Sequence, residues 1–223
     1  MLILWLYNLK KFVCSLFYPP KCIYCQKVLK SDEILCDKCS NEFKVEPIVR
    51  DFDLFDGIVF KVVSAFSYDG KVKEAICDFK FKNKLDYAKY FAKSIVETLE
   101  KTNNIGDFEY ICFVPMAKDH KKERGYNQAE ILAKSIGKIL KLPFKNVLFK
   151  AKITKIQHKL SRDERIINVK GAYGVLNKEE VKGKKILLCD DIITTGSTIK
   201  ECATTLYNAC AKNVLAVCIA SRD

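Results

Sequence analysis

Near the C-terminus, a short apolar stretch, two adjacent carboxylates and a loop of small hydroxyl residues follow one another as KILLCDDIITTGST, residues 185–198. The apolar residues 186–189 are typical of a strand covered on both faces, of which only the carboxyl end is free to meet a ligand. Asp190 and Asp191 stand at that end. Carboxylates accept hydrogen bonds from sugar hydroxyls and bind Mg²⁺ directly or through water. The pair is therefore predicted to hold a ribose and a magnesium ion.

The loop that follows offers hydroxyl groups and closely spaced backbone N–H groups from Thr194, Thr195, Gly196, Ser197 and Thr198. Gly196 lets the main chain approach a ligand closely, and a helix that begins here favours a bound phosphate. We therefore predict that this loop binds the 5-phosphate of the ribose. Capping and turn formation are the alternative role of such residues. The loop lacks the GxxxxGK[ST] pattern, which disfavours a nucleoside triphosphatase of the P-loop kind.

A second polar loop, VPMAKDHKKERGYNQAE at 114–130, begins where a predicted strand ends and leads into a predicted helix. This position places its cations and amides to bind a pyrophosphate group. The alternative is a solvated basic loop followed by a helix cap. The residues predicted to contact the pyrophosphate are Pro115, Met116, Ala117, Lys118 and Arg124.

A third loop at 152–165, KITKIQHKLSRDER, is too polar to pack on its own. We predict a lid that closes over pyrophosphate, excludes water and balances the charge of the leaving group through Lys152 and Arg165. A surface that binds nucleic-acid phosphates is the competing interpretation, because scattered Lys and Arg residues serve both purposes.

Four cysteines near the N-terminus have the spacing of a zinc-binding module, with two CxxC pairs separated by ten residues: Cys22, Cys25, Cys36 and Cys39. Four thiolates complete the coordination of Zn²⁺ and leave no position open for catalysis. The intervening segment is too short for an apolar core, so metal binding must order it. A CxxC redox pair is the alternative, but such a pair normally begins the helix of a thioredoxin-like unit and does not occur twice. Residues 1–45 are thus predicted to form an N-terminal helix and a structural zinc module.

The composition is that of a basic, globular protein. A chain of 223 residues with 49% hydrophobic content allows one full domain with a sizeable core, together with a small module. The formal net charge of +12 indicates an anionic partner, either a polyphosphate or a nucleic acid. No cleavable signal pattern accompanies the 11 cysteines, most of which lie in apolar runs, so a cytoplasmic location is predicted.

The first residues are apolar and aromatic, with LILWLYNL at 2–9 followed by two lysines. This run is too short to cross a bilayer. A helix that covers its own domain is the favoured role. Peripheral contact with the inner face of the cytoplasmic membrane is the alternative.

Strand-like and helix-like segments alternate after a predicted connector at 40–57. Apolar stripes with helical spacing occur at 88–99, 129–140 and 199–210. Strands are predicted at 58–67, 110–114, 147–149, 169–175, 186–189 and 214–220. Residues 58–223 are therefore predicted to form an α/β domain, with a mostly parallel sheet flanked by helices and ligands at the carboxyl ends of the strands.

Together these motifs resemble the ComF family of competence-related proteins, in which a zinc-binding segment precedes a type I phosphoribosyltransferase domain. Residues 189–198 are similar to the phosphoribosyl-diphosphate (PRPP) signature of that domain. Met116 and Ala117 depart from the valine and proline of many relatives. The resemblance spans nearly the whole chain and rests on the paired CxxC motifs, RGYNQA at 124–129, the spacing of Thr154, Gln157, Leu160, Arg165 and Asn168, GAY at 171–173 and CDDIITTGSTIKEC at 189–202.

The resemblance implies that the protein binds PRPP with Mg²⁺ and that a nucleophile displaces pyrophosphate from C1 of the ribose. The residues expected to serve this chemistry are Asp190, Asp191, Lys152 and Arg165, and no acceptor pocket is identifiable. The resemblance also implies a role in natural competence and DNA uptake, with single-stranded DNA and DNA-uptake or helicase proteins as partners. Three interpretations stay open: a phosphoribosyltransferase, a DNA-handling protein that uses PRPP as a ligand, and a regulator without turnover.

Overall fold

The structure is a computed structural model of the chain that describes residues 19–30, 33–117, 122, 124–151 and 171–222. The chain divides into two compact units, Met1–Lys44 and Val45–Asp223. Among the described residues, no helix has both the length and the apolar character needed to cross a membrane. The apolar run at 2–9 lies outside the described residues.

The first unit contains a tight turn and a short helix. An antiparallel bridge joins Lys21 to Val28 and folds the first CxxC motif back on itself. Helix α2 (Asp37–Glu42) begins directly after Cys36 and carries the buried Cys39. The backbone N–H of Ile23 donates to the carbonyl of Ile34, which draws the two CxxC segments together.

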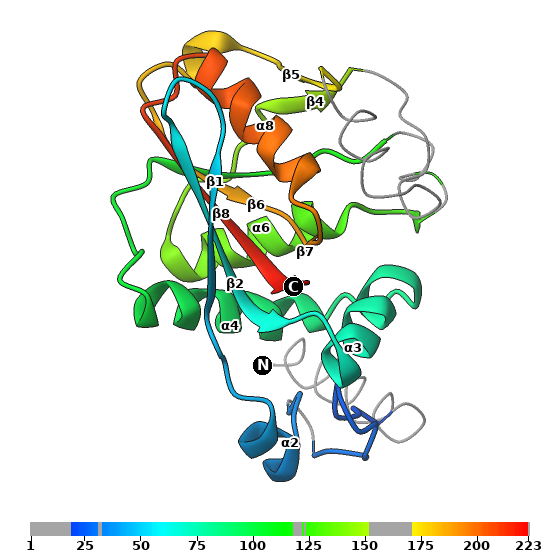
Figure 1. The fold of residues 1–223 in the computed structure, drawn as a ribbon. Helices are drawn as coiled ribbons and strands as arrows, with labels where there is room; N and C mark the ends of the chain where they lie inside the picture. Colours follow the sequence, from blue (N-terminus) through cyan, green and yellow to red (C-terminus); the bar gives the residue numbers. More distant parts are fainter. Residues whose placement is uncertain (1–18, 31–32, 118–121, 123, 152–170, 223) are drawn as a thin grey trace, which may run out of the picture. The chain divides into compact units, whose positions relative to one another are not determined.

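The second unit is built on a six-stranded sheet (Figure 1). Its path is β1-β2-β8-β6-β3, and β7 pairs with β8 beside that path. All the pairings are parallel except the one between β1 and β2. The strands are β1 (Ile48–Asp53), β2 (Val59–Ser67), β3 (Tyr110–Phe113), β6 (Lys185–Cys189), β7 (Ile192–Ile193) and β8 (Asn213–Ser221).

Helices cover both faces of this sheet, because the central strands are apolar on both sides. Alternate residues of β6, Ile186 and Leu188, share a buried cluster with Ile199 and Leu206 of α8 (Ser197–Asn208). On the other face, α4 (Tyr87–Lys101) packs against β2 and β8, and α6 (Gln128–Leu140) packs against β3 and β6. The predicted α/β architecture with a mostly parallel sheet is confirmed.

Four segments differ from the sequence prediction. The expected connector at 40–57 contains β1, which forms the edge of the sheet. Helix α3 (Gly70–Phe81) and the two-residue β7 were not predicted. The strand expected at 169–175 is β5 (Tyr173–Val175), and it pairs antiparallel with β4 (Leu148–Lys150) in a separate two-stranded sheet. A 3-10 turn, η2 (Lys178–Glu180), then leads toward β6.

Candidate ligand site and cysteine cluster

The four cysteines of the first unit come together as the spacing predicts. Their sulfur atoms all lie within 4.8 Å of one another, and those of Cys25 and Cys36 are 3.6 Å apart. A tetrahedral zinc ion with Zn–S bonds of about 2.3 Å would separate its sulfur ligands by about 3.8 Å. None of the four is in a disulfide. The cluster is therefore able to hold a zinc ion.

The thiols of this cluster differ in acidity. Burial raises the pKa of the Cys39 thiol, and the three neighbouring sulfurs raise it further. Burial also opposes ionisation of Cys22, but hydrogen bonds from the backbone of Cys25 and Cys36 outweigh it and lower the pKa of Cys22 to about 7. Four thiolates this close repel one another, and a divalent cation would remove that cost.

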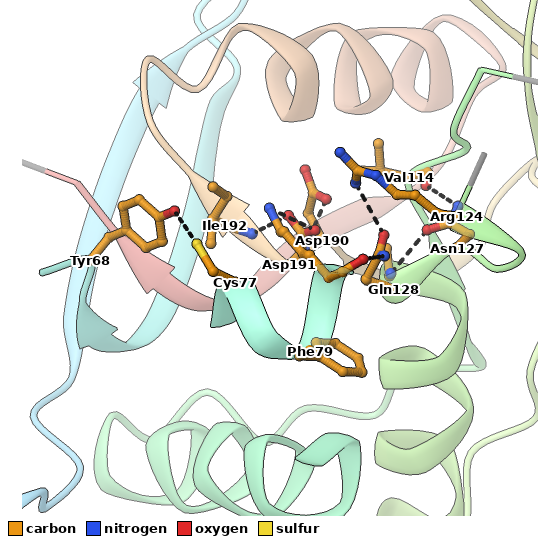
Figure 2. Close-up of polar contacts among 12 residues, drawn as sticks. Tyr68, Cys77, Phe79, Val114, Arg124, Asn127, Gln128, Asp190, Asp191 and Ile192 are labelled. Atoms are coloured by element: carbon orange, nitrogen blue, oxygen red, sulfur yellow. Dashed lines mark hydrogen bonds and ion pairs between the residues drawn. The ribbon is translucent and has the colours of Figure 1, made fainter. Parts of the chain in front are cut away.

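In the second unit, the acidic pair follows β6 directly and is held by β8 (Figure 2). The backbone N–H of Asp190 donates to the carbonyl of Val217, and the N–H of Ile219 donates to the carbonyl of Asp191. The N–H of Asp191 donates to Oδ1 of Asp190 at 2.8 Å, and the N–H of Ile192 donates to Oδ1 of Asp191 at 2.7 Å. These bonds fix both carboxylates at the carboxyl end of the strand.

The environment of the pair penalises its negative charge. Burial raises the pKa of Asp190 to about 8, and the adjacent charge of Asp191 adds to this shift. The ammonium group of Lys80 acts in the opposite direction. A site that keeps two carboxylates side by side at such a cost is typical of ligand or metal binding.

This raised pKa leads to a prediction about stability. We expect the free energy of unfolding of the ligand-free protein to fall as the pH rises from about 4 to about 8, because folded Asp190 keeps its proton over a window in which the unfolded chain has released it. The Asp190→Asn variant should lose this dependence and exceed the wild type by ~1–3 kcal/mol at pH 8. Urea unfolding from pH 4 to pH 9 measures both proteins, and parallel pH profiles would contradict the prediction.

The predicted phosphate loop lies between β7 and α8. Gly196 is the N-cap of α8 and has a φ of 77°, a left-handed conformation that favours glycine. The first N–H groups of a helix have no acceptor within the helix. Gly196 has no side chain to cap them, and the N–H of Ser197 donates to Oγ1 of Thr195 at 3.4 Å. The hydroxyl groups of Thr195 and Ser197 lie 2.8 Å apart just before and at the helix start. Such a helix start is suited to an anion.

Strand β1 supports this loop, a role that sequence reasoning missed. The guanidinium group of Arg50 donates through Nη1 to the carbonyl of Thr194 at 3.2 Å. The same nitrogen donates to Oγ of Ser221 and to the carbonyl of Arg222 at the end of the chain. A Cβ atom added to Gly196 would lie 2.8 Å from the ring of Phe52. The edge strand therefore braces the loop from the side.

Replacing Gly196 by alanine should destabilise the second unit more than the same change at Gly183. The two glycines have φ values of 77° and 72°, but an added Cβ at Gly183 would meet no atom within 4 Å. Gly183→Ala should cost ~1 kcal/mol from backbone strain alone, and Gly196→Ala should cost ~2–4 kcal/mol because it also displaces Phe52. Thermal unfolding of the two variants isolates the contact with Phe52. Equal losses would show that this contact is unimportant.

The RGYNQ segment fixes the second predicted loop to its surroundings (Figure 2). Asn127 caps α6, because its side-chain oxygen accepts from the N–H of Ala129 and its amide nitrogen donates to the carbonyl of Val114, both at 3.0 Å. The guanidinium carbon of Arg124 lies 4.6 Å from the ring centroid of Phe81. The start of α6 is thereby tied both to the end of β3 and to the end of α3.

The two predicted ligand loops begin at neighbouring strand ends. Strands β3 and β6 are paired in parallel, with Phe113 opposite Cys189. The N–H of Val114 donates to the carbonyl of Cys189 at 2.9 Å. Residues 115–117 follow one strand and Asp190 follows the other. Lys118, Lys152 and Arg165 lie outside the described residues.

A further residue at the site was not predicted. Nζ of Lys80, in the last turn of α3, lies 3.0 Å from Oδ2 of Asp191. The sequence does carry a signal for this helix, because the buried residues Val72, Ala75, Ile76 and Phe79 have helical spacing. The pairing with Asp191, 111 positions later (191 minus 80), has no such signal.

Known proteins are similar to this chain over much of its length. Residues 122–223 match the family model described as "Phosphoribosyl transferase domain". Competence protein F of Haemophilus influenzae is 30% identical over 81% of this chain and 81% of its own length. Competence protein ComFC of Bacillus subtilis is 26% identical over 83% of this chain and 77% of its own. DNA utilization protein YhgH of Escherichia coli is 24% identical over 89% and 88%.

Each of these relatives matches more than four-fifths of the chain. The family model covers the part that carries the RGYNQ segment, the acidic pair and the phosphate loop. The chain therefore belongs to the ComF family of competence proteins, and its C-terminal part is a phosphoribosyltransferase-type domain.

Proposed function

We propose that this protein binds PRPP together with Mg²⁺ and transfers the phosphoribosyl group to an acceptor with release of pyrophosphate. Asp190 and Asp191 would hold the ribose hydroxyls, and residues 194–198 would hold the 5-phosphate. Pro115, Met116, Ala117, Lys118 and Arg124 would hold the pyrophosphate, and Lys152 and Arg165 would close over it.

The observation that carries this proposal is the convergence of two loops at adjacent strand ends. The pairing of β3 with β6 brings the start of segment 115–117 beside the acidic pair. Helix α8 begins at Ser197, six positions after Asp191. A ligand with a sugar between a phosphate and a diphosphate would match the carboxylates, the helix start and the loop that begins at Pro115.

The residues present fit a magnesium ion that enters with its ligand. Mg²⁺ prefers oxygen donors and is commonly held by one or two carboxylates together with phosphate oxygens of the substrate. Asp190 and Asp191 supply two carboxylates at one strand end. When bound, the ion would neutralise part of the charge that develops on the leaving pyrophosphate.

In the proposed reaction, a lone pair of the acceptor forms a bond to C1 of the ribose. The bond between C1 and the pyrophosphate oxygen breaks, and its electron pair leaves with pyrophosphate. The carboxylates of Asp190 and Asp191 orient the sugar, and the cations of Arg124, Lys152 and Arg165 stabilise the leaving group. No protein side chain needs to form a covalent bond.

The cysteine cluster is proposed to hold a structural Zn²⁺ ion. Cys22, Cys25, Cys36 and Cys39 would occupy all four positions of a tetrahedral site. The short fold around them, with α2 as its helix in the described part of the unit, would depend on the metal for its stability.

Titration of PRPP with Mg²⁺ into the purified protein tests the binding step. We expect PRPP to bind saturably and only in the presence of Mg²⁺. Absence of PRPP binding would contradict the proposal. A pyrophosphate-release screen over nucleobases, amines and DNA then tests for turnover. PRPP binding without release by any acceptor would favour a regulator over a transferase.

A second candidate is a DNA-handling protein that uses PRPP as a ligand. It is favoured by the names of the relatives, which are competence proteins and a DNA utilization protein. We propose this role in the cytoplasm, where single-stranded DNA and DNA-uptake or helicase proteins would be the partners and the inner membrane face a place of contact. Binding of single-stranded DNA that falls steeply with salt would support it, and salt-insensitive binding or none would not.

A further inference from the structure

Helix α3 carries a lysine into the acidic site. Nζ of Lys80 lies 3.0 Å from Oδ2 of Asp191, and the two side chains are only 11% and 14% exposed. Ion pairs of this kind are screened much less than pairs at the surface. The pair therefore belongs to the interior of the site and differs from the exposed lysine pairs along the helices.

Lys80 completes the set of donors that fixes the Asp191 carboxylate. The backbone N–H of Ile192 donates to Oδ1 at 2.7 Å, and the ammonium group stands at Oδ2. One donor on each oxygen sets the orientation of the carboxylate plane. Without Lys80, only the bond to Oδ1 would remain among the described contacts.

The RGYNQ segment in turn fixes the end of α3 from which Lys80 projects. The hydroxyl of Tyr126 donates to the carbonyl of Phe79 at 2.6 Å, and Nε2 of Gln128 donates to the carbonyl of Lys80 at 3.1 Å. The last carbonyl groups of a helix lack partners within the helix. The RGYNQ segment supplies two of these partners.

We propose that Lys80 is a positioning residue of the PRPP site, which holds Asp191 in place for the ribose and links the acidic pair to the RGYNQ segment. This inference rests on the proposed function. With one donor on each carboxylate oxygen, Asp191 would keep a fixed orientation toward the ribose hydroxyls. Lys80 would therefore affect PRPP binding through Asp191, at the ribose.

Lys82 provides a matched control, because it lies two residues further along, at the C-cap of α3. Its ammonium group pairs with Asp78 one turn back, and its side chain is 67% exposed. Lys80→Met should weaken binding of PRPP with Mg²⁺ about 10- to 100-fold, the range typical of partners that orient a ligand-binding residue. Lys82→Met should bind PRPP as the wild type does. Isothermal titration calorimetry measures both.

Three ligands distinguish a positioning role of Lys80 from a general loss of structure in the variant. Ribose 5-phosphate contains the sugar that Asp191 would contact, so Lys80→Met should weaken its binding by a factor similar to that for PRPP. Pyrophosphate without Mg²⁺ contains no sugar, so its affinity should change little. A variant that had merely lost its structure would lose all three ligands together.

A double-mutant cycle tests whether Lys80 acts through Asp191. If it does, the Lys80→Met/Asp191→Asn variant should bind PRPP no more weakly than Asp191→Asn alone. Lys80→Gln serves the same cycle should the methionine variant fail to fold, as judged by thermal unfolding.

The results that would contradict the proposed function differ from those that would contradict the role of Lys80. If the wild type binds no PRPP, the proposed function is wrong. If the wild type binds PRPP and Asp191→Asn weakens it, but the Lys80 variants bind like the wild type or their effect adds fully to that of Asp191→Asn, the proposed function stands and the role of Lys80 is overturned.

Discussion

PRPP binding should fall at least ~100-fold when Asp190 and Asp191 are both replaced by alanine, because each hydrogen bond to a charged group contributes about 1.5–3 kcal/mol and about 1.4 kcal/mol is a factor of ten in affinity. The two carboxylates stand at the carboxyl end of β6, with their main chain fixed by β8. Titration calorimetry with PRPP and Mg²⁺ measures the loss.

The control for this experiment is Asp86→Ala. Its side chain is 92% exposed and lies 3.7 Å from Lys89 at the surface, so PRPP binding should be unchanged. Thermal unfolding distinguishes lost contacts from lost structure. The loss of Asp190 removes a carboxyl whose charged form is disfavoured, since burial raises its pKa to about 8. The loss of Asp191 leaves the nearly buried ammonium group of Lys80 without its partner, so the thermal unfolding of the double variant is measured beside its affinity. Equal heats from the wild type and the double variant would remove the ribose assignment.

Loss of the cysteine cluster should unfold the first unit. In the Cys22→Ser/Cys39→Ser variant, we expect zinc content to fall from near-stoichiometric to none and residues 19–44 to lose protection from hydrogen exchange. Structural zinc contributes about 10–16 kcal/mol in small modules, far more than so short a segment could gain from its own core. Elemental analysis and hydrogen exchange measure the two effects.

Cys210→Ser is the matched control, because Cys210 is exposed and lies outside the cluster. It should keep its zinc and its exchange pattern. A purified wild type without near-stoichiometric zinc would contradict the zinc assignment. So would a cluster variant in which residues 19–44 keep their protection.

Local patterns were sufficient for several elements. The run at 186–189 is buried along its whole length, so apolar content alone marks β6 as a central strand. Helices α4, α6 and α8 each bury the stripe of apolar residues that their sequences space at helical intervals. The spacing of the two CxxC motifs was sufficient to predict that their four sulfur atoms lie together.

The edge strand of the sheet could not be recognised from the sequence pattern. Strand β1 has the sequence IVRDFD, with half-buried and exposed residues in alternation. An edge strand of this kind is as polar as a connector, so its pattern does not distinguish the two. The pairing of β4 with β5 was missed for a different reason. A strand of three residues is too short to show which sheet it joins.

The amino-acid sequence by itself determined which residues could carry charge and metal: the acidic pair, the hydroxyl loop and the paired cysteines, because each depends on spacing over a few positions. Only the tertiary structure decided what stands beside them. Arg50 and Phe52 brace the phosphate loop from β1, and Lys80 reaches Asp191 from α3. These contacts join residues more than a hundred positions apart, and no local preference encodes them, since they arise when β8 pairs with both β2 and β6 and so fixes the strand order of the sheet.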